Sequence, residues 1–377
     1  MLIRSTETPP GTAYVVIGAT GGASDWKIEP NIGETGVRHD PLCNLQQYLQ
    51  PFWLSDTIYN ETVLLYSTAG GAAEGKCLYR PDKILSVRNF SLDSVYHQGT
   101  DYLLHDRTLT RTPGSRMPFR ADTSFDIKKD LAWYNIQSQW VVVTYTHHDK
   151  WDGPAPSYQG DRVPRLTQLL HSSRPVNIVA YGMSITRGMD VSAYDRVAPY
   201  MPTYMELFVQ GLKQRYPHSP VTLYNAGLPG STVAWGAQYA EYYIPPLHPD
   251  LVVIDFGMND FWRMPPAEFG DSIRTIIRKV RLADPAAEFL LLGNMKFDPT
   301  YVLDFDSTKA FYTGNLAGYA GELRKLEGMG VVMLNMTDIS DAIYRRKKAK
   351  DCIVNPLHPN DYMARWYAQG MVEMVGR

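Results

Sequence analysis

The stretch IVAYGMSITRG, Ile178–Gly188, decides the fold. A run of apolar and aromatic residues ends at a glycine, and a single serine, Ser184, follows before a polar turn. Near-continuous apolar runs of this kind are typical of strands buried in a parallel sheet. Ser184 is then either an exposed nucleophile at a strand-to-helix corner or an ordinary helix cap, which also favours serine. The sequence around it has to decide between the two.

Four more short apolar runs follow, and each is separated from the next by a longer amphipathic segment. The runs are VTLYN (221–225), LVVIDF (251–256), EFLLLGN (288–294) and VVMLN (331–335). Helices are expected near 202–216, 232–243, 266–283, 309–329, 339–348 and 361–374. Strands that alternate with helices in this way predict a doubly wound parallel sheet covered on both faces. Ligands bind beyond the carboxyl ends of the strands in such sheets, so the residues that follow each strand are the candidates for a site.

The part of the chain before this pattern is different. Residues 1–150 contain short runs rich in β-branched and aromatic residues, with Gly, Pro, Asn and Asp between them. Frequent short strands with turn signals predict an N-terminal β-sandwich, of the jelly-roll kind. A stretch dense in Gly, Pro and Asp follows, so residues 151–174 are expected to form a linker. Residues 175–377 then form the α/β domain.

Composition limits the partners. The chain has 377 residues, of which 44% are hydrophobic, and a formal net charge of −2. Such a balance argues against nucleic acid or an anionic membrane surface as the main partner. No run approaches the roughly 20 apolar residues of a spanning helix, and no secretion signal is visible, so a soluble protein is expected. The 3 cysteines are widely spaced and do not form a zinc motif. The sequence indicates neither an oligomeric state nor a compartment.

Four polar groups follow strands or precede the last helix. Ser184 comes after the first strand, and the glycine-rich loop NAGLPGST (225–232) comes after the second. Asn259 follows the third strand and could donate to a developing oxyanion. His358 lies in a proline-rich loop before the last predicted helix, from which it could reach the serine and act as a general base. Taken singly, each of these residues is more often a turn or cap residue.

In this order, the groups resemble the SGNH (GDSL-like) hydrolase family. The resemblance covers about Asn177–Arg377 and includes four blocks of residues. These are Gly182 with Ser184, the glycine block with Gly227, the GxND block with Gly257, Asn259 and Asp260, and the C-terminal block with His358. The segment Tyr96–Phe119 also resembles the ancillary domain of bacterial carbohydrate-active members.

The resemblance implies an ester hydrolase that needs neither a metal nor an organic cofactor. Ser184 would attack the ester carbonyl, and His358 would take the serine proton and return it to the leaving alcohol. The backbone N–H groups of Ser184 and Gly227, together with the Asn259 side chain, would hold the oxyanion.

Two positions depart from the family pattern. Met183 stands where the family usually has Asp, so the local hydrogen bonding must differ. Asn355 stands where the family usually has the Asp that orients the histidine. Either Asn355 or a backbone carbonyl orients His358, which gives a Ser–His dyad, or another acid such as Asp351 substitutes. The dyad is the favoured hypothesis.

The sequence therefore predicts a carbohydrate esterase that removes acetyl groups from a glycan. The acyl-ester chemistry comes from the resemblance, and the glycan from the ancillary domain and from the 25 Tyr and 8 Trp residues. A lipid acyl hydrolase and a glycan-binding protein with an inactive hydrolase domain are the alternatives.

Overall fold

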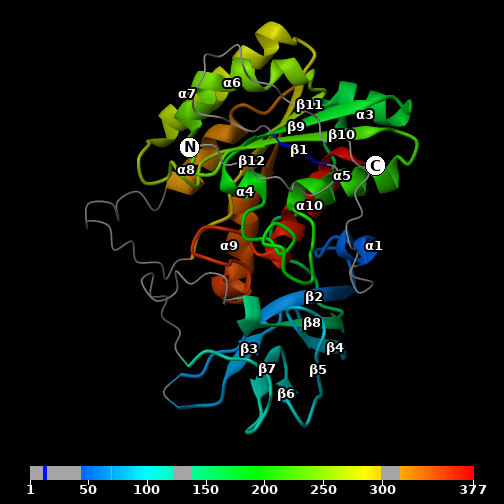
Figure 1. Ribbon diagram of the computed structural model, residues 1–377, viewed down its shortest axis with the longest axis vertical. Coiled ribbons are helices and arrows are strands. Elements are labelled where there is room, and N and C mark those ends of the chain that lie inside the picture. The colour runs from blue at the N-terminus through cyan, green and yellow to red at the C-terminus, as the bar shows by residue number, and fades with distance from the viewer. Residues whose placement is uncertain (1–11, 15–43, 69, 122–136, 299–314) are drawn as a thin grey trace.

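A six-stranded, all-parallel sheet forms the centre of the larger domain in the computed structural model (Figure 1). The structure describes residues 12–14, 44–68, 70–121, 137–298 and 315–377. The strand order is β1-β10-β9-β11-β12-β13. The bounds are β1 (Thr12–Tyr14), β9 (Val176–Gly182), β10 (Val221–Gly227), β11 (Leu251–Asp255), β12 (Glu288–Gly293) and β13 (Val331–Asn335). Almost every residue of β9, β11 and β12 is buried, which explains the continuous apolar runs in the sequence.

Helices cover both faces of this sheet. The helices α6 (Val233–Tyr243), α7 (Pro266–Ala283) and α8 (Asn315–Arg324) pack in sequence on one face. On the opposite face, α5 (Tyr204–Arg215) packs against α10 (Asp361–Val375). The chain crosses from one face to the other next to β9, because β10 and β11 lie on either side of it. This reversal point is where doubly wound sheets open a crevice for a ligand.

The antiparallel part of the chain forms two smaller sheets, which lie at the lower end of the molecule in Figure 1. One sheet has the order β2-β8-β4-β5 and the other β3-β7-β6. The strands are β2 (Thr57–Leu64), β3 (Glu74–Lys76), β4 (Lys83–Asn89), β5 (Val95–Tyr96), β6 (Tyr102–His105), β7 (Thr108–Arg111) and β8 (Trp140–Thr146). A short helix, α1 (Leu45–Tyr48), precedes them. Strands β4, β6, β7 and β8 lie within the runs rich in β-branched and aromatic residues, and β2 overlaps one of these runs.

The structure departs from the predicted division of the chain at two places. Strand β1 lies within the range 1–150 but pairs in parallel with β10, so it extends the sheet of the α/β domain. The range 151–174 was predicted to be a linker but contains α3 (Pro164–His171). Leu166 and Leu170 of this helix are buried in the same core as β9. The preceding Gly- and Pro-rich stretch hides this short helix in the sequence.

Two further helices complete the described fold. The helix α9 (Met336–Arg346) follows β13, and the short helix α4 (Ser184–Arg187) begins directly after β9. The segment between α9 and α10 contains a single 3₁₀ turn, Ala349–Asp351, and then the loop that carries His358. The first part of the helix predicted near 309–329 lies outside the described residues, and α8 accounts for the rest only as far as Arg324.

Candidate active site

Ser184 lies at the reversal point of the sheet, at the start of α4. Gly182 ends β9 there, and no side chain fits at this position. A Cβ on Gly182 would lie 2.1 Å from Thr186 Oγ1 and 2.2 Å from the Asp255 carbonyl oxygen. The glycine therefore lets the chain turn tightly against β11. Because Ser184 is in the first turn of α4, its N–H has no carbonyl partner within the helix.

Thr186 holds this corner together. Its Oγ1 accepts the Met183 N–H at 2.9 Å and donates to Asp255 Oδ2 at 2.9 Å. Asp255 also accepts hydrogen bonds from the Tyr204 hydroxyl and the Asn294 amide, both at 2.6 Å. Burial raises the pKa of Asp255 to about 6, although these hydrogen bonds act in the opposite direction. Asp255 thus connects the corner at Thr186 to the Tyr204 and Asn294 side chains.

Met183, which replaces the usual Asp of the family, is completely buried. Its sulfur lies 3.9 Å from Asn259 Nδ2, so the thioether packs against the amide. The Thr186 hydroxyl satisfies the backbone N–H of Met183. The local hydrogen bonding at this position therefore needs no carboxylate.

His358 faces the serine. Its Nε2 lies 2.8 Å from Ser184 Oγ, although 174 positions separate the two residues in the chain. The histidine loop is closed on itself, because the Val354 N–H donates to the His358 carbonyl oxygen at 3.1 Å and the Asn360 N–H to that of Cys352 at 2.9 Å. The structure thus brings together the two residues that the sequence predicted to be nucleophile and base.

The acid beside the histidine is Asp190. Its Oδ2 lies 2.5 Å from Nδ1 of His358, and the Asp190 side chain is 9% exposed. A carboxylate accepts hydrogen bonds only, so Nδ1 carries the proton and Nε2 is left to accept the serine hydroxyl. Asp190 was not among the candidates from the sequence. The only signal for it is an acidic residue six positions after the serine, in the polar turn SITRGMD.

Two earlier candidates for the orienting group have other partners. Asp351 accepts the Leu64 N–H at 2.7 Å and lies 3.9 Å from the Lys347 ammonium, so it faces the N-terminal domain. Asn355 is next to the histidine, with Nδ2 3.0 Å from Nδ1, but this Nδ2 donates to Asp190 Oδ2 at 2.5 Å. The Ser–His dyad hypothesis is therefore corrected to a Ser–His–Asp arrangement, because a carboxylate occupies the Nδ1 side of the ring.

Asn355 links the acid to the histidine loop. Its Oδ1 accepts the backbone N–H groups of Leu357 at 2.8 Å and His358 at 2.9 Å. Its amide N–H group reaches the carboxylate of Asp190. The side chain therefore fixes the loop and the acid relative to each other.

The oxyanion groups predicted from the sequence are only partly free. The Gly227 N–H donates to Asn225 Oδ1 at 3.0 Å, and the Asn225 amide in turn donates to the Thr186 carbonyl oxygen at 2.8 Å. Gly227 is thus engaged within the fold, contrary to the prediction. Asn259 is partly buried, and its Nδ2 donates to the Ser231 carbonyl oxygen at 2.9 Å. The other N–H of this amide contacts the Met183 sulfur at 3.9 Å, and a thioether is a weak acceptor that a ligand oxygen can replace.

Asp260, the residue after Asn259, supports the next helix instead of the reaction centre. Its Oδ1 accepts the Val233 N–H at the start of α6 at 3.0 Å, and burial raises its pKa to about 6.

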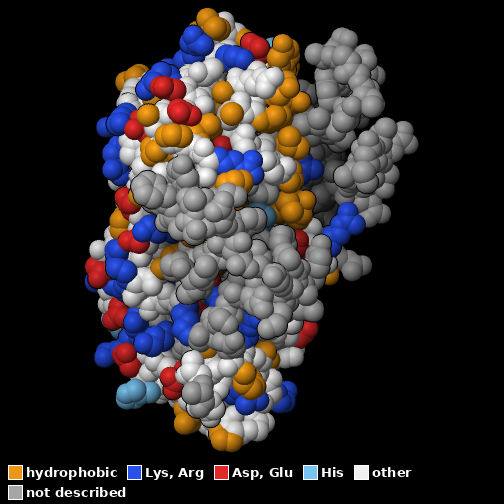
Figure 2. All heavy atoms as spheres, turned by 90° about the vertical axis from the view of Figure 1, so that its left-hand side faces the viewer, with side chains coloured by type: hydrophobic (Ala, Val, Ile, Leu, Met, Phe, Trp, Pro, Cys, Tyr) orange, Lys and Arg blue, Asp and Glu red, His pale blue; other side chains and the backbone are white. Residues whose placement is uncertain are grey.

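Within the described ranges, no group of three or more His, Cys, Asp or Glu residues could hold a metal ion. Those ranges also contain no helix that is both long and apolar enough to cross a bilayer. Acidic and basic side chains are interspersed on the face shown in Figure 2.

The fold and the site together define a class. A serine at the start of a helix, a histidine that accepts its hydroxyl and an aspartate on the far side of the imidazole form the geometry of serine hydrolases. Residues 180–366 match the model of the GDSL-like lipase/acylhydrolase family. This part of the chain is therefore a GDSL-like lipase/acylhydrolase domain.

Comparison with solved structures gives distant similarities. One is to a two-domain esterase, CEX, active on acetylated mannans, with 22% identity, a TM-score of 0.45 and coverage of 58% of this chain and 54% of that one. A second is to Axe2, an acetylxylan esterase from Geobacillus stearothermophilus, with 16% identity, a TM-score of 0.40 and coverage of 54% and 96%. A third is to LAE5, an α/β hydrolase from the metagenome of Lake Arreo, with 18% identity, a TM-score of 0.41 and coverage of 54% and 97%. The chain thus spans about half the length of CEX. The comparison with curated proteins found no match.

Proposed function

We propose that this protein hydrolyses carboxylic esters through an acyl-enzyme formed on Ser184. The observation that carries the proposal is the 2.8 Å contact between Ser184 Oγ and His358 Nε2, with Asp190 on the other side of the ring. His358 takes the hydroxyl proton as Oγ attacks the ester carbonyl, and then returns it to the leaving alcohol. Water then attacks the acyl-enzyme in the same way, with His358 as the base, and the carboxylic acid is released.

Three donors are proposed to stabilise the oxyanion. The Ser184 N–H and the Asn259 amide are two of them. For the third we propose the Gly230 N–H in place of Gly227, because Gly230 is exposed and its N–H donates to no group of the described residues. Gly230 also directly precedes Ser231, whose carbonyl oxygen holds the Asn259 amide. Each preorganised donor of this kind is worth about 3–4 kcal/mol in the transition state.

As the substrate we propose an acetylated glycan. The support is a set of aromatic side chains on α6, the helix that follows the Gly230 loop. Trp235 contacts Tyr239 with ring centroids 5.4 Å apart, and Tyr242, which is 54% exposed, continues the stripe. Exposed aromatic faces are suited to stack on the apolar faces of sugar rings. An ester of a long-chain fatty acid is the competing substrate.

For the N-terminal part we propose that the two antiparallel sheets form a β-sandwich. A Cβ added to Gly75 of β3 would lie 2.4 Å from Val63 Cγ1 of β2, so the two sheets approach closely there. Both residues belong to chain segments with side chains in one continuous core. Partner sheets with a shared apolar interior are what defines a sandwich.

The decisive experiment combines active-site labelling with product analysis. A serine-reactive phosphonate should label the wild-type protein once, on Ser184, and should leave Ser184→Ala unlabelled. Both Ser184→Ala and His358→Ala should lose turnover while they keep the wild-type circular dichroism spectrum. Acetylated oligosaccharides should lose mass in steps of one acetyl group. Wild-type protein that is neither labelled nor active, yet binds glycans, would show that the hydrolase domain is inactive.

Relative rates on two model esters separate the substrate classes. We expect p-nitrophenyl acetate to be hydrolysed much faster than the ester of a long-chain fatty acid. The reverse order would identify a lipid acyl hydrolase and would leave the assignment of Ser184 and His358 unaffected.

A further inference from the structure

The loop that carries His358 is inserted into the N-terminal domain. Val354, four positions before the histidine, is 3% exposed and belongs to a small apolar cluster. Every other member of this cluster comes from the antiparallel sheets or their loops: Leu64, Tyr66, Phe90, Leu92, Trp140 and Val142. The Val354 N–H donates to the His358 carbonyl oxygen at 3.1 Å. The apolar anchor is therefore connected directly to the backbone of the proposed base.

Polar contacts fix both ends of the same loop to the N-terminal domain. Before the loop, the Trp140 indole N–H donates to the Lys350 carbonyl oxygen at 3.0 Å, and the Leu64 N–H donates to Asp351 at 2.7 Å. After the loop, the Asn360 amide donates to the Thr62 hydroxyl at 3.2 Å. All of these side chains are buried. Strands β2 and β8 thus hold the histidine loop at its start, its middle and its end.

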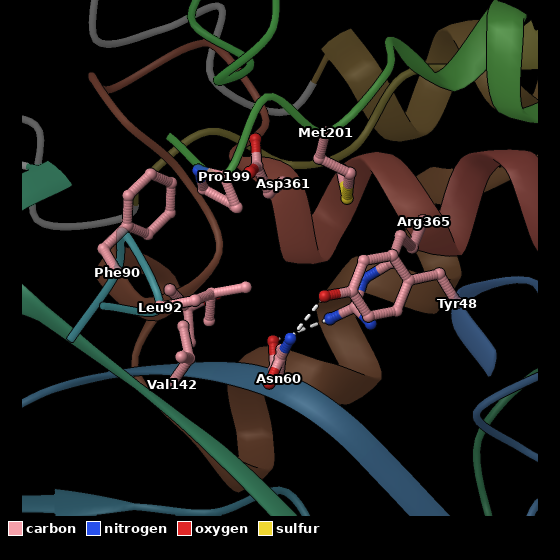
Figure 3. A pocket seen from close by; sticks show the side chains of 10 residues that line it. Tyr48, Asn60, Phe90, Leu92, Val142, Pro199, Met201, Asp361 and Arg365 are labelled. Atoms are coloured by element: carbon pink, nitrogen blue, oxygen red, sulfur yellow. Dashed lines mark hydrogen bonds between the residues drawn. The ribbon is translucent and has the colours of Figure 1, made fainter. Parts of the chain in front are cut away.

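The loop that carries Asp190 contacts the same domain. Gln137, just before β8, donates from Nε2 to Asp195 at 3.0 Å. Pro199 and Met201 of this loop line a small cavity of about 20 Å³, together with Phe90, Leu92 and Val142 of the N-terminal domain. Figure 3 shows these side chains facing one another across the cavity. The acid loop therefore rests on the same patch of side chains as the histidine loop.

We infer that the N-terminal domain is a positioning part of the active site. In it, Val142 and Trp140 fix the loop that carries His358 relative to the loop that carries Asp190. The inference rests on the proposed roles of Ser184, His358 and Asp190. Those two loops meet at the Asp190 carboxylate, which contacts both His358 Nδ1 and the Asn355 amide, while the nucleophile follows β9. Catalytic groups must be held within about 0.5 Å of the productive geometry, and a misplacement of about 1 Å can cost a hundredfold in rate. The β-domain supplies that support from outside the α/β fold.

Strand β8 offers a matched pair of variants to test this inference. Val142 and Val143 are adjacent and both buried, but Val142 belongs to the cluster around Val354 and Val143 belongs to the main core. Val142→Ala and Val143→Ala remove the same atoms from opposite faces of one strand. We expect both to lower the melting temperature. Only Val142→Ala should lower kcat for p-nitrophenyl acetate, by roughly tenfold and with KM nearly unchanged.

Trp140→Phe is the second variant, since it keeps a smaller aromatic ring in the cluster and removes the hydrogen bond to Lys350. It should lower kcat several-fold, and it should change the acid limb of the pH profile of kcat/KM, a readout that depends on the contact between His358 and Asp190. All assays are run well below the melting temperature of each variant. Equal kcat values for Val142→Ala and Val143→Ala, with a wild-type profile for Trp140→Phe, would overturn the inference.

The same assay contains Ser184→Ala as a reference. If Ser184→Ala is inactive while the two valine variants behave alike, the positioning role fails and the proposed function stands. If Ser184→Ala is as active as the wild-type protein, the proposed function itself fails.

Discussion

Asp190 accepts a hydrogen bond from the Asn355 amide at the same oxygen, Oδ2, that lies 2.5 Å from His358 Nδ1. The acid comes from the loop after the nucleophile, while the amide comes from the histidine loop. Asp190 adopts a φ of +68°, in the left-handed region that Asp tolerates better than most residues. The carboxylate is thus supplied by a sharply turned segment near the serine, which explains why position 355 can hold an amide.

The first prediction concerns this carboxylate. Asp190→Asn should keep the fold but lower kcat by about 10³–10⁴, because an amide stabilises the wrong imidazole tautomer and does not stabilise the imidazolium. Turnover of p-nitrophenyl acetate at neutral pH measures the effect. Asp271→Asn, on the exposed surface of α7, serves as the control. Retention of more than a third of the activity by Asp190→Asn would refute the role of the acid.

The second prediction concerns the shared amide. Asn355→Ala should lower kcat by about tenfold, which corresponds to the loss of roughly one net hydrogen bond in the transition state. The loss is smaller than for Asp190→Asn, because the carboxylate stays beside the ring. Comparison of the two variants in one assay checks the order. A larger loss for Asn355→Ala would make the amide, not the acid, the main orienting group.

The sequence predicts the parallel sheet well because its strands are buried on both faces and so form continuous apolar runs. It also singles out Ser184, His358 and Asn259 as candidates, since each lies soon after a strand or in the loop before the last helix. Asp190 was missed because its partnership with His358 is created by a turn in the left-handed region, which leaves no periodic pattern. Gly227 was predicted as a donor because a sequence does not reveal that the Asn225 side chain occupies the Gly227 N–H, and Gly230 was not among the candidates.

The third prediction concerns the oxyanion. Asn259→Ala should lower kcat by about 10²–10³ and leave KM within a few-fold, because the amide acts on charge that develops only in the transition state. Pre-steady-state acylation by p-nitrophenyl acetate measures the affected step. The variant should still react with the phosphonate, only more slowly. An unchanged acylation rate would remove Asn259 from the oxyanion site.

The fourth prediction concerns stability at the Ser184 corner. Thr186→Val keeps the shape of the side chain but leaves the Met183 N–H without an acceptor and removes one of the two hydroxyl donors to Asp255 Oδ2, which keeps the Tyr204 hydroxyl. A buried group left unsatisfied costs about 1–3 kcal/mol and a lost hydrogen bond about 0.5–1.5 kcal/mol, so the free energy of unfolding should fall by about 2–4 kcal/mol. Denaturation by urea measures the change. Thr275→Val, whose hydroxyl donates only to the Asp271 carbonyl oxygen within α7 in an exposed hydrogen bond, should change it little.

The fifth prediction concerns pH. Burial, together with the neighbouring Asp190, raises the pKa of Asp195 to about 6, and His358 partly opposes this shift. A carboxyl group whose pKa is raised by folding makes the protein less stable as the pH rises from about 4 to about 6, because the unfolded chain gives up the proton first. Asp195→Asn removes this loss and keeps an oxygen that can accept the Gln137 amide. The free energy of unfolding of Asp195→Asn relative to the wild-type protein should therefore be larger at pH 7 than at pH 4, as urea denaturation at the two pH values measures. A difference between the two proteins that does not change with pH would contradict the raised pKa of Asp195.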